Sequence, residues 1–254
     1  MRNAGSSLAV LVAAGAIALG AGCGERERPV TVATDTGFVP FEFIDTRTGE
    51  LVGFDIDLIR AIADRAGFEI RIVTLDFDGI VAGVQSGRFD IGIAGMTITE
   101  ARAETIDFSD PYYDAGLILA VRADETEIRS EADLAGRRVG TRTGTTSEDY
   151  LRRRHPDAQV VAFPGIVEAY MDLRAGRLDA VLYDVPNVRY YAAREGGGEI
   201  RTVGDVLQGE QYGIAFPKGS PLVAPVNDAL RELRADSTFD RLHETWFGDP
   251  EPEE

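Results

Sequence analysis

Short apolar segments alternate along most of the chain with segments whose apolar residues recur at helical spacing, and this alternation restricts the possible folds most strongly. Val30–Thr34 and Ile70–Leu75 have the length and composition of buried strands. Between them, apolar residues recur three and four positions apart over residues 54–66, and Gly67 ends this predicted helix. Strands that alternate with helices are typical of βαβ units around a largely parallel sheet. The sequence therefore predicts an α/β fold.

One segment has a counterpart later in the chain. Ser86-Gly-Arg-Phe-Asp-Ile-Gly-Ile-Ala-Gly95 aligns without gaps with Ala175-Gly-Arg-Leu-Asp-Ala-Val-Leu-Tyr-Asp184. Both segments predict a helix end, a glycine turn and a buried strand, although a glycine at a helix end is common in any such turn. If the likeness reflects two similar lobes, one strand of each lobe ends at a shared boundary, at Gly95 and at Asp184. Ligands of open α/β sheets bind beyond the carboxyl ends of strands, so a site is expected there.

Composition excludes several function classes. The 254 residues include 26 Lys and Arg against 43 Asp and Glu, for a formal net charge of −17. This excess argues against nucleic acid, whose phosphates need a basic face, and against electrostatic adhesion to anionic lipid. The single cysteine, Cys23, excludes an internal disulfide and a multi-cysteine metal site. We expect no metal and no cofactor.

Residues 1–22 are typical of a secretion signal. Arg2 precedes an apolar run, Leu8–Leu19, that as a helix would span about 18 Å, well short of the roughly 30 Å hydrocarbon core of a membrane. Small residues lead directly to Cys23, which resembles a bacterial lipobox, although Gly20 stands where Leu is usual. The alternative is a free cysteine near an ordinary cleavage site. We expect a lipid on Cys23, a tether over residues 23–29 and a location outside the cytoplasm.

The residues after the two strand ends are suited to an amino acid. Thr99 can cap a short helix whose N-terminal amides favour an anion, and Arg102 offers two parallel donors to a carboxylate. Asp184 can accept hydrogen bonds from an ammonium group. Together they would hold an α-amino acid between two lobes. The alternatives are a solvated Arg102 and an Asp184 that caps the following helix.

Several motifs resemble the polar-amino-acid-binding proteins of ABC importers, the extracytoplasmic solute-binding proteins of family 3. They follow one another from residue 30 to residue 248, and within the family the likeness is greatest to the glutamine-binding members. The motifs are Val32-Ala-Thr-Asp-Thr-Gly-Phe-Val-Pro-Phe-Glu-Phe43, Gly53-Phe-Asp-Ile-Asp-Leu58, Gly95-Met-Thr-Ile-Thr-Glu-Ala-Arg102, Ile106-Asp-Phe-Ser-Asp110, Gln211-Tyr-Gly-Ile-Ala-Phe-Pro-Lys-Gly-Ser220 and Trp246-Phe-Gly248.

This resemblance implies a two-lobed periplasmic-binding-protein-like fold of type II, in which each lobe is a mixed β-sheet flanked by helices. Two hinge strands would cross between the lobes near residues 112–116 and 208–212. The implied parts are lobe 1 over residues 30–112 and 212–248, lobe 2 over residues 113–211, and an acidic tail over residues 249–254. The protein would be a monomer that closes on its ligand and delivers it to the permease subunits of an ABC importer.

The resemblance also implies which residues bind the α-groups of the ligand. Arg102 and Thr97 correspond to the family's carboxylate-binding residues, and Ala94 and Gly95 to its backbone contacts. Asp184 corresponds to the residue that binds the ammonium group.

Around the ligand side chain, Phe38 and Phe77 correspond to aromatic walls that exclude water. Asp35 corresponds to a carboxylate that faces the ligand side chain. At three further positions the residue differs from that of the glutamine-binding members, and these are Arg142 in place of Lys, Thr146 in place of Gly and Tyr183 in place of His.

The charges of Asp35 and Arg142 predict a ligand preference. A glutamine amide both donates and accepts, so it satisfies one carboxylate and one guanidinium without adding charge. Glutamate would face Asp35, and a cationic ligand would face Arg142. An unpaired buried charge costs about 3–5 kcal/mol, more than a hundredfold in affinity. We expect glutamine first, glutamate next, and arginine or histidine last.

Two other classes of function are open. Cyclohexadienyl dehydratases resemble these binding proteins in fold, but such an enzyme needs a general acid in the cleft. Neither histidine is expected to have a chemical role, because His155 lies in a basic, surface-like segment and His243 lies beside core positions of the last helix. The sequence has no nucleophile elbow or P-loop. We expect no catalytic residue and no enzyme. A receptor component that signals through a separate partner is the other alternative.

Overall fold

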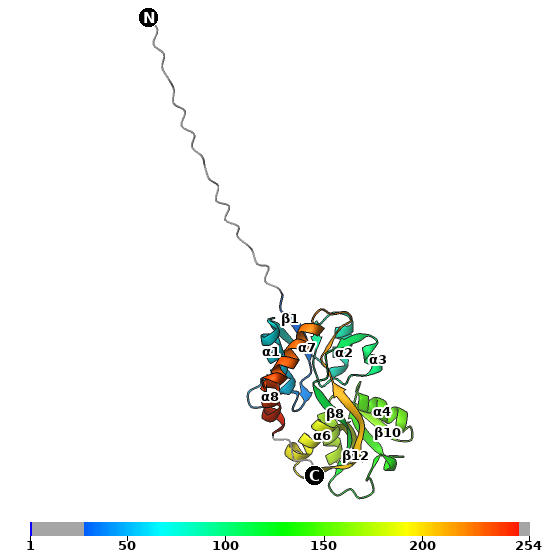
Figure 1. Cartoon of the computed structure of the whole chain (residues 1–254). Coiled ribbons are helices and arrows are strands. Elements are labelled where there is room, and N and C mark those ends of the chain that lie inside the picture. Colours follow the sequence, from blue (N-terminus) through cyan, green and yellow to red (C-terminus); the bar gives the residue numbers. More distant parts are fainter. Residues whose placement is uncertain (2–27, 249–254) are drawn as a thin grey trace.

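The structure, a computed structural model, describes Met1 and residues 28–248 and shows the predicted two-lobed α/β fold (Figure 1). The first lobe contains a five-stranded sheet in the order β5-β1-β6-β13-β7. β1 is parallel to β5 and β6, whereas β13 is antiparallel to β6 and β7. The strands are β1 (Val30–Thr34), β5 (Ile70–Thr74), β6 (Ile91–Gly92), β7 (Ile106–Phe108) and β13 (Ala215–Pro217).

The second lobe repeats this plan in the order β10-β9-β11-β8-β12. β9 is parallel to β10 and β11, and β8 is antiparallel to β11 and β12. Each lobe is thus a mixed sheet with a parallel centre. Its strands are β8 (Tyr113–Arg122), β9 (Arg138–Arg142), β10 (Gln159–Phe163), β11 (Ala180–Asp184) and β12 (Ile200–Tyr212).

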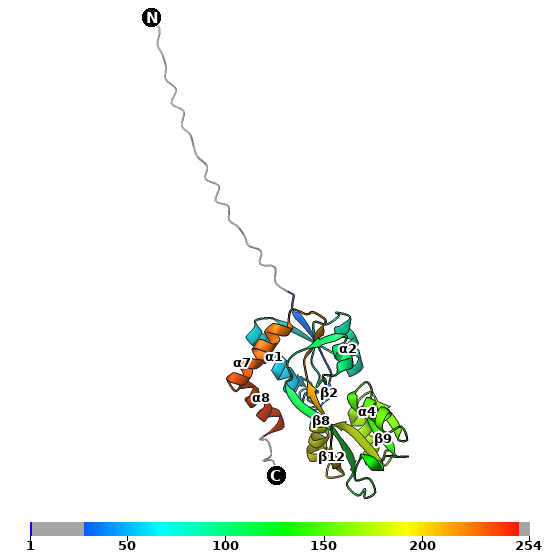
Figure 2. The same cartoon turned by 45° about the vertical axis from the view of Figure 1, so that its right-hand side comes forward.

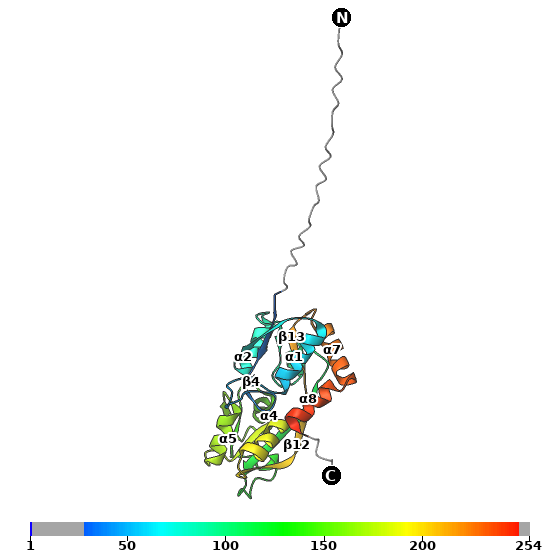
Figure 3. The same ribbon diagram turned by 90° about the vertical axis from the view of Figure 1, so that its left-hand side faces the viewer.

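Helices flank both sheets, and in the first lobe α1 packs against α7 and α8 on one side (Figure 3). As predicted, α1 ends at Gly67, which adopts a left-handed φ of 78°. The first lobe has α1 (Phe54–Ala66), α2 (Phe77–Gln85), α3 (Glu100–Ala103), α7 (Val223–Ala235), α8 (Thr238–Phe247) and a small sheet of β2 (Gly37–Phe38), β3 (Glu42–Ile44) and β4 (Leu51–Val52). The second lobe has the α-helices α4 (Thr146–Arg154), α5 (Ile166–Arg174) and α6 (Val185–Tyr190). It also has a 3₁₀-helix, η1 (Glu131–Asp133), and a π-helix, η2 (Tyr191–Glu195).

The chain passes between the sheets twice, at the start of β8 and at the end of β12 (Figure 2). These two segments pair with each other, with Tyr113 opposite Tyr212. The end of β12 also lies along the segment after β6, because Ile98 N donates to Gln211 O at 2.8 Å. Both lobes and both crossings therefore meet in one region.

The repeated sequence segment begins with the same local structure in both lobes. The predicted strand end at Gly95 is wrong, because β6 ends at Gly92, whereas β11 does run to Asp184. Gly87 and Gly176 follow a helix with φ of 72° and 71°. Asp90 then accepts a hydrogen bond from Thr31 N in β1 at 2.8 Å, and Asp179 accepts one from Arg138 N in β9 at 2.8 Å. The aspartate of each segment thus ties its own strand to the neighbouring strand.

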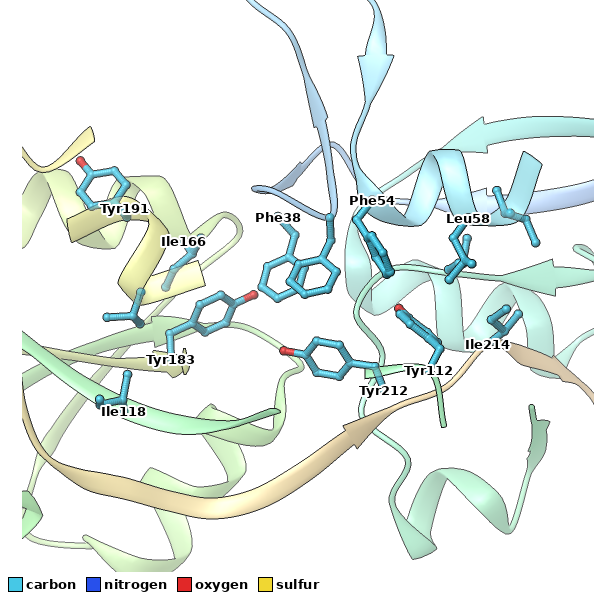
Figure 4. Packing of buried hydrophobic residues seen from close by; sticks show 14 of the residues in the cluster. Phe38, Phe54, Leu58, Tyr112, Ile118, Ile166, Tyr183, Tyr191, Tyr212 and Ile214 are labelled. Carbon is cyan, nitrogen blue, oxygen red and sulfur yellow. The ribbon is translucent and has the colours of Figure 1, made fainter. Parts of the chain in front are cut away.

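The buried hydrophobic core is continuous between the two lobes, and aromatic residues form the connection. The ring of Phe38 in the first lobe packs edge-on against Tyr183 of the second lobe, with centroids 5.7 Å apart, and stacks on Phe41 at 5.0 Å. Figure 4 shows Phe38, Tyr183 and Tyr212 gathered where the lobes meet. Aromatic packing therefore fills part of the region between the sheets.

Three sequence predictions fall outside the described residues. They are the signal over residues 1–22, of which only Met1 is described, the lipid on Cys23 with most of its tether, and the acidic tail over residues 249–254. Within residues 28–248, no helix combines the length and the apolar character needed to cross a membrane.

Candidate ligand-binding site between the lobes

A small, partly open cavity lies between the lobes. Its walls include all the predicted site residues of the folded chain except Asp35, and also Thr145, which the sequence analysis missed. The lining residues are Phe38, Phe77, Ala94, Gly95, Thr97, Arg102, Arg142, Thr145, Thr146, Tyr183 and Asp184. Residues from distant parts of the chain thus meet around one space.

Arg102 reaches this cavity from the short helix α3. Thr99 caps α3 as predicted, and its hydroxyl accepts from Arg102 N at 3.2 Å. The guanidinium of Arg102 donates from Nη1 to Thr97 O at 2.8 Å and from Nη2 to Gly144 O of the other lobe at 3.3 Å. It lies 5.4 Å from the ring centroid of Phe77. The head group is thus fixed at the cavity, which argues against the alternative of a freely solvated arginine.

Gly95 can offer a ligand less than expected. Its N–H donates to Asp55 Oδ2 at 2.8 Å, and the same oxygen accepts from Tyr112 Oη at 2.8 Å. Burial raises the pKa of Asp55 to about 6. Because the N–H of Gly95 is already bonded, its carbonyl oxygen is the polar group that it can present to a ligand.

Gly95 also lies where a side chain would not fit. Its φ is +52°, and a Cβ at this position would lie 2.2 Å from the ring of Phe38. The close approach of backbone and ring thus depends on glycine.

Asp184 ends β11 at the opposite side of the cavity. Its side chain does not cap the helix that follows, which was the alternative interpretation, and instead accepts a hydrogen bond from the hydroxyl of Tyr212. Burial, and then repulsion from Glu210, raises the pKa of Asp184. An ammonium group at the cavity would favour the ionised form of this carboxyl.

Asp35 and Arg142 form a buried ion pair that joins the two lobes. Their side chains are 6% and 4% exposed. Arg142 Nε also donates to Pro164 O at 3.0 Å, and Asp35 Oδ1 accepts from Thr36 N at 2.6 Å. Both were expected to face the ligand; in the structure they pair with each other, and Arg142 lines the cavity whereas Asp35 does not.

Two buried residues of the second crossing, Glu210 and Tyr212, were not among the predicted site residues. Side chains two positions apart on a strand point to the same face, and these two are buried while Gln211 between them is exposed. Glu210 Oε2 accepts from Thr97 Oγ1 at 3.0 Å, whereas Tyr212 reaches Asp184. The available signal was their spacing, because two residues that lie two positions apart in the predicted hinge strand have side chains on the same face.

Comparisons with known proteins give matches over nearly the whole folded chain. The family model of the bacterial extracellular solute-binding proteins, family 3, matches residues 30–249. The ABC transporter arginine-binding protein 1 of Escherichia coli K12 is 30% identical over 94% of this chain and 97% of its own length.

Two solved structures extend the comparison. An ancestral arginine-binding protein bound to glutamine superposes with a TM-score of 0.82 at 42% identity, covering 87% of this chain and 98% of that one. An ancestral amino-acid-binding protein described as a precursor of cyclohexadienyl dehydratase has a TM-score of 0.80 and 38% identity over 86% of this chain and 95% of that one. Arginine and glutamine both occur among these names, so the ranking of ligands stays a prediction.

Proposed function

The chain belongs to the bacterial extracellular solute-binding proteins of family 3, and from this premise we propose that it captures a polar L-amino acid between its lobes and delivers it to an ABC importer. One observation carries the proposal. Arg102 on the first lobe and Asp184 on the second line the same cavity. A guanidinium suits an α-carboxylate and a carboxylate suits an α-ammonium group, so one α-amino acid satisfies both lobes.

We propose that the lobes close on the ligand, and contacts between the lobes support this. Arg102 bonds Gly144 O across the cavity, and Asn187 Nδ2 of the second lobe donates to Val39 O of the first at 2.7 Å. A ligand that bonds both lobes stabilises the closed form by its differential affinity for that form. We propose residues 30–112 with 212–248 and residues 113–211 as the two moving units.

We propose glutamine as the preferred ligand and glutamate as the next. The Asp35–Arg142 pair is already balanced in charge. The side-chain amide of glutamine hydrogen-bonds without adding a charge beside that pair. Glutamate would bring a second negative charge near Asp35, so its binding requires protonation or water.

Arginine is the competing ligand, because a relative with 30% identity is named for it. A cationic side chain could use Asp35 only after Arg142 had moved away from it. That movement would leave the guanidinium of Arg142 buried without its partner, which costs about 3–5 kcal/mol.

Isothermal titration calorimetry tests this ranking, after a thermal-shift screen of the twenty amino acids. Glutamine is expected to bind tightest, with arginine more than about a hundredfold weaker. Tighter binding of arginine than of glutamine would overturn the glutamine preference while leaving the amino-acid class intact.

An Arg142→Met variant sharpens the test. Without Arg142, the carboxylate of Asp35 is free to pair with a cationic ligand, so we expect glutamine to weaken and arginine to strengthen. Arg138→Met is the matched control, because Arg138 lies on the same strand and pairs with Asp179 away from the cavity. An unchanged preference in Arg142→Met would show that the ion pair does not select the ligand.

We propose binding without turnover, by a monomer anchored outside the cytoplasm through lipid on Cys23. The relative from Escherichia coli is named as a binding protein, although one similar structure is described as a precursor of a dehydratase. Release of a dehydrated product from a prephenate-like substrate would contradict the non-enzymatic proposal.

Intact masses of the membrane-extracted protein and of the Cys23→Ser variant test the proposed lipid on Cys23.

A further inference from the structure

Glu210 lies beside the cavity on the second crossing, and the proposed function does not use it. Its side chain is buried. Oε2 accepts from Thr97 Oγ1 at 3.0 Å, and Oε1 accepts from Gln208 Nε2 at 3.0 Å. Gln208 has a left-handed φ of 44°, which is uncommon for a residue with a side chain. The hinge backbone thus places an amide donor on one oxygen of Glu210 and a hydroxyl on the other.

The hydroxyl of Thr97 has only one proton to donate. If Glu210 is ionised, both of its oxygens are acceptors, and the proton of Thr97 is committed to Glu210. Thr97 then presents only lone pairs to the cavity, and these repel a ligand carboxylate. If Glu210 is a neutral acid, it can donate to Thr97 Oγ1, and the proton of Thr97 becomes available to the ligand.

We propose that Glu210 is a positioning residue that acts as a neutral carboxylic acid, donating from Oε2 to Thr97 Oγ1 so that Thr97 donates to the α-carboxylate of the bound amino acid. This inference rests on the proposed function and deepens it. Gln208 completes the arrangement, because its amide fits the carbonyl oxygen Oε1 of the neutral acid.

The charged groups around Glu210 allow this protonation state. Asp184 faces it from the end of β11, Arg102 from α3, and the phenol of Tyr212 from its own strand. Burial raises the pKa of Glu210, while hydrogen bonds from Thr146, Thr97 and Gln208 and the charge of Arg102 oppose the rise.

The ligand determines which carboxyl keeps the proton. Its ammonium group stabilises the ionised form of Asp184, and the negative charge of Asp184 then disfavours a second charge on Glu210. The proton therefore resides on Glu210 in the complex. At high pH, where the unliganded pair has lost this proton, binding takes up one proton and no other group need change.

Calorimetry with glutamine across about pH 6 to about pH 8.5 tests the inference on the wild type, Glu210→Gln and Glu210→Ala. In the wild type, affinity is expected to fall by up to about tenfold per pH unit above the pKa of the unliganded pair. Glu210→Gln keeps a donor toward Thr97 and an acceptor toward Gln208 but cannot ionise. We expect it to bind like the wild type at low pH and to lose this pH dependence.

Glu210→Ala removes the donor to Thr97, so we expect weaker binding at every pH. Gln211→Ala is the matched control on the exposed face of the same strand, and it should keep the wild-type profile. Equal pH dependence in the wild type and Glu210→Gln would overturn the inference, as would equal weakening by Gln and Ala. Failure of the wild type to bind any amino acid would instead overturn the proposed function.

Discussion

The repeated segment starts alike in the two lobes, and it differs at its end. In both lobes a left-handed glycine ends a helix, and an aspartate binds the N–H of the neighbouring strand. The segment then ends in Gly95 in the first lobe and in Asp184 in the second. Gly95 lets the backbone approach Phe38, whereas Asp184 presents a carboxylate. The repeated part is scaffold, and we propose that the difference at its end determines what each lobe can bind.

The largest effect is expected from removing the α-group contacts, one lobe at a time. Asp184→Ala should reduce glutamine affinity more than a hundredfold, because the ligand ammonium loses its buried counter-charge. Arg102→Ala should have a similar effect through the carboxylate. Calorimetry measures both, and circular dichroism should show intact folds. Near-normal affinity in either variant would mean that its residue does not bind the α-group assigned to it.

Gly95→Ala should change stability where Asp184→Ala does not. A Cβ at Gly95 would meet the Phe38 ring at 2.2 Å with the backbone at φ +52°. Such overpacking and strain cost about 1–3 kcal/mol each. Urea unfolding should show a clear loss of stability for Gly95→Ala and little for Asp184→Ala. Equal stabilities would show that the equivalent positions are not specialised as we infer.

The scaffold aspartates Asp90 and Asp179 should behave alike. The bond from Arg28 lowers the pKa of Asp90, and the bond from Arg138 lowers that of Asp179. A lowered folded-state pKa stabilises the fold above the unfolded pKa of about 3.9, and this contribution is lost as pH falls through the folded value.

Because both side chains remain partly in water, Asp90→Asn and Asp179→Asn should each cost only about 1 kcal/mol at neutral pH. The difference from wild type should shrink below about pH 3, as measured by urea unfolding at both pH values. If the loss of stability in a variant persists at low pH, the replaced aspartate acts through something other than its charge.

The smallest effect is expected at the arginines that pair with these aspartates. The side chain of Arg28 is 72% exposed and that of Arg138 is 42% exposed. Exposed ion pairs contribute little, and Asp90 keeps its hydrogen bonds from Thr31 N and Thr31 Oγ1, so Arg28→Ala should lower the urea midpoint only marginally. Arg138→Ala should lower it slightly, because Arg138 also donates to Gly176 O at 3.1 Å. A larger loss for Arg28→Ala would reverse the comparison.

Local patterns predicted the scaffold well. The spacing of apolar residues predicted the helix over residues 54–66, and the residue type of Thr99 predicted a cap. Both predictions needed only local sequence, and both are confirmed. The repeated segment predicted the end of β11 at Asp184 but not that of β6, which ends at Gly92, and the resemblance to the family indicated Arg102 and Asp184.

The rest depends on contacts between residues far apart in the chain. Asp35 and Arg142 pair although they lie more than a hundred residues apart in the chain, and nothing in the local sequence of either residue indicates the other. The bond from Gly95 N to Asp55 and the one from Thr97 to Glu210 are of the same kind. Such contacts arise only when both lobes and the hinge strands are assembled.

We propose that one lobe binds the α-carboxylate and the other the α-ammonium group of a single amino acid. Calorimetric titration with glutamine, with Nα-acetylglutamine and with glutamine amidated at its α-carboxyl tests it most directly. We predict binding of one glutamine per chain and loss of more than about a hundredfold in affinity for each analogue. Equal affinity for either analogue and for glutamine would contradict the claim.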